Sequence, residues 1–136
     1  MRIAIVALIG CSGTHPSPIA NAATAATGCT AVAWHDDDTA TTRSYEGRLE
    51  ILELAIPNGK VEKPFVVVLD RPACLPANSE PGETSEIQIY SPDPAIRARI
   101  DSLVGARVAI AGQGFVAHTA HHHRPIVVTV ERIDAR

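Results

Sequence analysis

The clearest indication of the fold comes from residues 86–114, EIQIYSPDPAIRARIDSLVGARVAIAGQG. This stretch predicts a strand, a helix and another strand in succession. Its first five residues alternate polar and apolar side chains. This pattern is typical of a half-buried strand over Glu86–Tyr90 with Ile87 and Ile89 inward. A second alternating run predicts a strand over Arg107–Ala111. The stretch therefore predicts strands on both sides of one helix.

The helix between these strands has clear signals at both ends. Asp93 is a favourable N-cap residue, and Pro94 then occupies the first helical position, where its missing N–H costs nothing. Gly105 is well placed to end the helix. The apolar residues expected on one face are Ile96, Ile100, Leu103 and Val104.

Three further strands are predicted outside this stretch. Tyr45–Leu54 mixes apolar and charged residues, and its inward parity switches near Ile51, which indicates a strand with a bulge or strong bend. A helix is the competing interpretation, but the turn signal Pro57-Asn58-Gly59 favours the strand. Phe65–Leu69 (FVVVL) predicts a central strand that is buried on both faces, and Ile126–Ile133 predicts the last strand.

The resulting order is three strands, one helix and two strands. This is the order of an OB-fold, a small five-stranded barrel, so we expect a mainly β domain over residues 43–136. Gly112 and Gly114 mark a sharp bend of the kind that barrel closure requires. An open α+β sheet with one covering helix is the alternative.

The N-terminus resembles a targeting segment. A short positive start precedes the apolar run Ile3–Ile9, which is too short to cross a bilayer and suits the core of a signal peptide. Ala20-Asn21-Ala22 is a small-x-small cleavage site, so residues 1–22 are predicted to be a signal peptide and residues 23–42 an N-terminal arm or linker. This interpretation predicts export to the periplasm or the medium.

Two other interpretations of the N-terminus stay open. Leu8-Ile9-Gly10-Cys11 is similar to a lipoprotein box, in which Cys11 would carry a lipid that anchors the protein to a membrane. The apolar run could instead be a buried N-terminal strand, although the segment after it, rich in Ala, Thr, Ser and Pro, offers that strand no pattern of partners.

Cleavage after Ala22 leaves two cysteines, Cys29 and Cys74, in an oxidising compartment. A disulfide between them would stabilise the fold by roughly 4 kcal/mol in the chain-entropy model. Two free buried thiols are the alternative.

Composition limits the partners. The net charge is −3 with no basic stripe, and only 4% of residues are aromatic, so we expect no nucleic-acid partner. The 46% apolar fraction is enough for a packed core. We expect a monomer with no transmembrane helix.

Four of the six histidines lie within the segment AHTAHHHRP, residues 117–125. Neutral imidazole is a common ligand for zinc, copper or nickel. His121 and His123 share one face of an extended segment, and His118 could supply a third ligand across the turn. The alternatives are structural hydrogen bonds to loop carbonyls and a pH-responsive or catalytic role.

The segment GQGFVAHTAHHHRPI, residues 112–126, resembles the closing motif of an uncharacterised bacterial family, domain of unknown function 4431. YEGRL at residues 45–49 and LDRPAC at residues 69–74 fit the same family, as does Cys29. The resemblance extends from Cys29 to Ile133 and implies export, a Cys29–Cys74 disulfide and a barrel. The family supplies no activity.

The residues present no catalytic constellation such as a Gly-x-Ser-x-Gly elbow or a phosphate-binding loop. We therefore expect a non-enzymatic binding or structural module of the cell envelope. Metal binding through His118, His121 and His123 is the alternative function. A weaker alternative is binding of an oligosaccharide or a nucleic acid single strand, which needs exposed aromatic residues. Phe65 and Tyr90 are the candidates.

Overall fold

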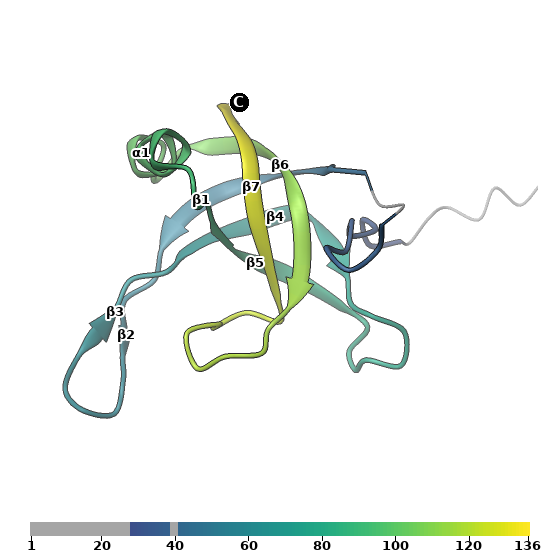
Figure 1. Ribbon diagram of the computed structural model, residues 1–136, viewed down its shortest axis with the longest axis horizontal. Coiled ribbons are helices and arrows are strands. Elements are labelled where there is room, and N and C mark those ends of the chain that lie inside the picture. Colours follow the sequence, from purple (N-terminus) through teal and green to yellow (C-terminus); the bar gives the residue numbers. More distant parts are fainter. Residues whose placement is uncertain (1–27, 39–40) are drawn as a thin grey trace, which may run out of the picture.

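Five strands close into one barrel in the computed structural model, which describes residues 28–38 and 41–136 (Figure 1). They are β1 (Arg43–Ile51), β4 (Phe65–Cys74), β5 (Glu83–Tyr90), β6 (Arg107–Val116) and β7 (Ile126–Ala135). The spatial order is β1-β4-β5-β7-β6, and β6 pairs back with β1. Among these five strands, β5 and β7 pair in parallel and the other neighbours pair antiparallel. This arrangement confirms the mainly β barrel of OB type and excludes the open sheet. The predicted signal peptide and Cys11 lie outside the described residues.

The apolar core lies inside the barrel and follows the strand patterns. Ile87 and Ile89 point inward from β5, as predicted. Val66 and Val67 are adjacent on β4 and both fully buried, which confirms that this strand is covered on both faces. The other fully buried large side chains include Leu49, Ile100, Val108, Ile110, Ile126, Val128 and Val130.

Helix α1 (Pro94–Ser102) begins as predicted. The Asp93 carboxylate accepts hydrogen bonds from the backbone N–H groups of Ala95 and Ile96. Ile100 is fully buried, but Val104 is 39% exposed because the helix ends before it, so its predicted place on the buried face is wrong. Among the barrel strands α1 lies between the third and the fourth, β5 and β6. No helix among the described residues is long and apolar enough to cross a membrane.

The parity switch near Ile51 marks the end of β1 rather than a bulge within it. The chain leaves the barrel there and forms a short hairpin from β2 (Leu54–Ala55) and β3 (Val61–Glu62), which the sequence pattern did not predict. The predicted turn is correct, with left-handed φ values of 97° at Asn58 and 74° at Gly59. In Figure 1 this hairpin and the loop after β6 project at the bottom, whereas α1 lies at the top.

The predicted bend at Gly112 is a β-bulge, and β6 continues past it to Val116. The register between β6 and β7 shifts between Ala111 and Gly112. A Cβ atom at Gly112 would lie 2.1 Å from the carbonyl oxygen of Thr129, so only glycine fits this approach of two backbones.

The segment 28–38, which is the described part of the predicted arm or linker before residue 41 and is called the arm from here on, packs on the barrel. The predicted disulfide Cys29–Cys74 is present, with 4.9 Å between the two Cα atoms. The backbone of Thr30 pairs with β4 beside Cys74, and Trp34 forms a parallel bridge with Gly114 of β6. The arm is therefore fastened at two points.

Candidate functional site

The histidines lie in the loop that joins β6 to β7, residues 117–125, here called the histidine turn. The backbone N–H of Ala117 donates to the carbonyl of Pro125 at 3.0 Å and closes the base of the loop. Inside it, the N–H of His122 donates to the carbonyl of Thr119 at 3.1 Å. The histidine turn is thus a folded loop whose side chains have defined positions.

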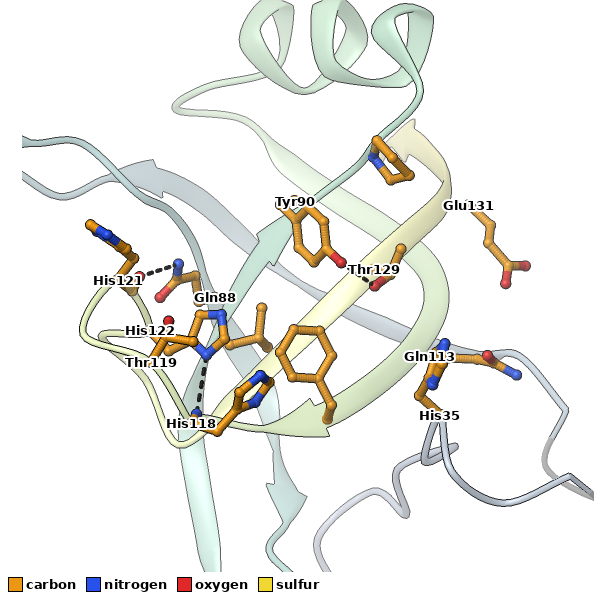
Figure 2. Close-up of a pocket in the computed structure, with 13 residues that line it drawn as sticks. His35, Gln88, Tyr90, Gln113, His118, Thr119, His121, His122, Thr129 and Glu131 are labelled. Carbon is orange, nitrogen blue, oxygen red and sulfur yellow. Dashed lines mark hydrogen bonds between the residues drawn. The ribbon is translucent and has the colours of Figure 1, made fainter.

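Gln88 of β5 holds the histidine turn against the barrel. Its Nε2 donates to the carbonyl of His121 at 3.0 Å, and its Oε1 accepts from the backbone N–H of His123 at 2.7 Å. The nitrogen and the oxygen of one side-chain amide therefore each bond a backbone group of the turn that has no partner in the sheet. Figure 2 shows Gln88 beside His121.

Glu62 of β3 holds the same turn from the other side. One carboxylate oxygen lies 2.6 Å from His121 Nδ1, and the other lies 2.5 Å from His123 Nε2. The pKa of Glu62 is lowered from its ordinary value. The largest cause is the hydrogen bond with His123, and the hydrogen bond and charge of His121 add to it, whereas burial acts in the opposite direction. We call this contact the Glu62 latch, because it ties the β2–β3 hairpin to the histidine turn.

His118 and His122 form a second pair, at the other end of the turn. The backbone N–H of His118 donates to Nδ1 of His122 at 3.1 Å, so that atom carries no proton in this arrangement. Nδ1 of His118 lies 3.0 Å from the carbonyl of Val116, so it is the protonated nitrogen of that ring. Burial and the three neighbouring imidazoles lower the pKa of His122, which favours its neutral form.

The structure separates the three predicted metal ligands. His121 and His123 share Glu62, whereas His118 pairs with His122. Within residues 28–38 and 41–136, no group of three or more His, Cys, Asp or Glu side chains has a geometry that could hold a metal ion. The observed contacts fit the structural alternative, and the three-histidine metal site stays a prediction.

A groove of about 940 Å³ lies beside the histidine turn, on the outer face of the barrel (Figure 2). Phe115 of β6 lines the groove and lies close to three other rings of the lining. Its ring centroid is 6.1 Å from that of Tyr90, 5.4 Å from that of His118 and 5.2 Å from that of His122. Tyr90 is 44% exposed, although it is large and aromatic. Four rings therefore form one open wall that the barrel core does not use.

Polar groups surround these rings. The side chain of Thr129 donates to the Tyr90 hydroxyl at 3.2 Å, and Gln113 and Glu131 line the groove beside them. None of the described residues that line the groove is a lysine or an arginine. The groove thus combines apolar ring faces with hydrogen-bonding groups and carries no permanent positive charge.

Sequence reasoning identified Tyr90 as a candidate and missed Phe115 and Thr129. Phe65, the other candidate, packs partly against the core instead of lining the groove. The sequence of β6 weakly indicated that the side chain of Phe115 points outward. Glycines alternate there with larger residues, in the order Gly112, Gln113, Gly114 and Phe115. Two small inward residues therefore leave the other two on the outer face.

The fold and the groove define a small OB-type barrel with an open, ring-lined face. Residues 86–134 match the family model described as "Domain of unknown function (DUF4431)", which confirms the resemblance to that family over this segment. The match runs from β5 through α1 to β7 and includes the whole histidine turn. No curated protein matches the chain.

Proposed function

We propose that this protein is a non-enzymatic binding module of the cell envelope, which holds a neutral, polar, ring-containing ligand in the groove beside the histidine turn. The observation that carries the proposal is the wall formed by Tyr90, Phe115, His118 and His122. A water-exposed cluster of rings is costly for the barrel alone. It is the common composition of a ligand site when polar groups converge on it.

The charges of the groove favour a neutral ligand. Glu131 is its acidic residue, and its histidines are weak bases. A phosphate or nucleic-acid ligand would need arginine or lysine partners, which the lining does not supply. A neutral ligand with hydroxyl or amide groups finds donors and acceptors in Gln113, Thr129 and Tyr90.

The histidines of the groove act in this proposal as a preorganised wall. Nδ1 of both His118 and His122 is engaged by backbone groups, so each ring has a fixed orientation and presents Nε2. A rigid wall binds with a smaller entropy loss than a mobile loop would. The Glu62 latch and Gln88 hold the backbone that carries these rings.

Export is part of the proposal and is supported by the disulfide, because such bonds persist in oxidising compartments. Cleavage after Ala22 would release a soluble module, and lipidation of Cys11 would tether the same barrel to a membrane. The intact mass of the mature protein distinguishes these two outcomes.

Calorimetry with the neutral disaccharide cellobiose and the anionic single strand hexathymidylate tests the proposed function. We expect cellobiose to bind and hexathymidylate not to bind. The variant Phe115→Ala should weaken cellobiose binding roughly tenfold. Val104→Ala, which shortens an exposed apolar side chain outside the groove, should leave it unchanged. Absent cellobiose binding, or equal binding by Phe115→Ala, would overturn the proposal.

A further inference from the structure

A second hollow adjoins the groove. It has a volume of about 380 Å³ and shares two residues, His35 and Phe115, with the larger groove. Its lining is completed by Trp34, Asp36, Pro76 and Val116. The two hollows are therefore separate but adjacent, with His35 and Phe115 in both linings.

The second hollow is built largely by the arm. The N–H of His35 donates to the carbonyl of Gly114 at 2.9 Å, and the N–H of Gly114 donates to the carbonyl of Ala33 at 2.8 Å. These two bonds fix the backbone on either side of Trp34 along β6. The Cys29–Cys74 disulfide fastens the start of the same arm to β4. The position of Trp34 thus depends on the backbone pairing of the arm with β6 and on the disulfide to β4.

We propose that the two hollows form one continuous site for a linear, neutral oligosaccharide, and that the disulfide-fastened arm supplies its distal subsite. This inference rests on the proposed function and names its ligand class. Tyr90 and Phe115 line the larger groove, and Trp34 lines the smaller hollow with the part of its ring that does not pack against the core. A linear chain of sugar rings matches such a lining, because each ring has an apolar face and a rim of hydroxyl groups.

The polar lining of the two hollows suits hydroxyl groups. Asp36 in the smaller hollow and Glu131 in the larger supply carboxylates that accept hydrogen bonds from hydroxyls. None of the described residues that line either hollow is a lysine or an arginine, which disfavours an acidic polysaccharide. Neutral sugars therefore fit both the rings and the charges.

An extended peptide fits this site less well. Peptides that bind to sheets usually add a strand to a free edge. The barrel is closed, and β6 already bonds to the arm beside Phe115 through Gly114. The backbone groups that a peptide would need at this place are therefore engaged.

The chain contains one tryptophan, so its fluorescence reports on the distal subsite alone. We titrate the oxidised protein with cello-oligosaccharides from cellobiose to cellohexaose. Cellohexaose should shift the Trp34 emission and bind roughly tenfold more tightly than cellobiose, because it occupies both subsites at once. Cellobiose should bind the larger groove and leave the emission almost unchanged.

Three variants separate the subsites by calorimetry. The double variant Cys29→Ser, Cys74→Ser removes the covalent one of the two points that fasten the arm. Trp34→Phe and Asp36→Ala alter the distal lining while the disulfide stays intact. Each variant should bind cellohexaose no more tightly than cellobiose and should retain its affinity for cellobiose. The control Val104→Ala should keep the wild-type affinity for both sugars. If the double variant does not fold, the two single variants decide the outcome.

The outcomes distinguish the two proposals. Equal affinity for cellobiose and cellohexaose, with binding still dependent on Phe115, would overturn this inference and leave the proposed function standing. A length-dependent gain that persists in both Trp34→Phe and Asp36→Ala would also overturn it. Binding of no oligosaccharide at all would remove the inference together with the proposed function.

Discussion

Nε2 of His123, in the histidine turn, lies 2.5 Å from the carboxylate of Glu62, which stands 61 positions earlier on the β2–β3 hairpin. The other oxygen of the same carboxylate bonds His121. One acidic residue therefore joins two loops that the barrel strands leave separate. The exposed fraction of the side chain is only 20% for Glu62 and 17% for His123, so water competes weakly for this contact.

Breaking the latch should loosen the histidine turn. In Glu62→Ala, the backbone amides of residues 117–124 should exchange with deuterium roughly tenfold faster, because one of the side chains that hold the turn against the rest of the protein is lost. Hydrogen exchange measured by mass spectrometry checks this. The matched control is Glu53→Ala, which removes a carboxylate near the same hairpin that bonds Lys63 instead of the turn. Equal exchange rates of the histidine turn in both variants would show that the Glu62 latch does not stabilise it.

The pKa of His122 predicts how stability changes with pH. Its folded pKa is lowered from 6.5, so the neutral form is favoured by folding. This contribution is complete above the unfolded pKa and is lost as the pH falls through that value toward the lower folded pKa. The contribution of His122 to the free energy of unfolding should therefore decrease on acidification from about pH 8 to about pH 5.

Denaturant unfolding across this range measures the effect. His122→Asn offers a side-chain oxygen in place of Nδ1 and does not titrate, so its unfolding free energy should depend less on pH. An undiminished slope in this variant would contradict the assignment. The lowered pKa of Glu62 acts in a separate window, because its contribution is present above the ordinary value of 4.5 and is lost only in stronger acid.

The sequence predicted those parts of the fold that are determined by a few consecutive residues. The cap at Asp93 and the alternation over Ile87 and Ile89 each involve a few consecutive residues, and both were correct. The latch was not predictable in this way, because Glu62 and His121 lie 59 positions apart and no periodic pattern relates them. The β2–β3 hairpin was missed because its strands have only two residues each.

The groove was predicted only in part for the same reason. The histidine cluster was visible in the sequence, but its division into two pairs depends on Gln88 and Glu62, which come from other strands. Alternation alone also could not predict whether Tyr90 is exposed or buried, because an aromatic residue at the end of a strand can take either position. Tertiary contacts decided each of these points.

The disulfide should contribute strongly to stability. Opening it releases a loop with a sequence separation of 45, which the chain-entropy model values at about 4 kcal/mol. The double variant Cys29→Ser, Cys74→Ser should unfold at a much lower denaturant concentration than the oxidised protein. Urea unfolding measures the difference. A loss below about 1 kcal/mol would mean that the arm is not fastened by this bond.

Gly112 should tolerate no side chain. In Gly112→Ala the new Cβ would meet the carbonyl of Thr129 at 2.1 Å, so β6 and β7 must separate. We expect a loss of about 3 kcal/mol. The control is Gly59→Ala in the β2–β3 turn, where no atom lies within 4 Å and only the left-handed φ of 74° opposes the substitution. Its cost should be about 1 kcal/mol, and equal losses would contradict the bulge geometry.

Both proposals require the ring-lined groove to bind a neutral sugar. A map of backbone amide shifts, recorded by nuclear magnetic resonance during titration with cellohexaose, tests this binding most directly. We expect shifts that concentrate at Tyr90, Phe115 and Thr129 and extend to Trp34. Shifts confined to the opposite end of the barrel around α1, or no shifts at any concentration, would contradict it.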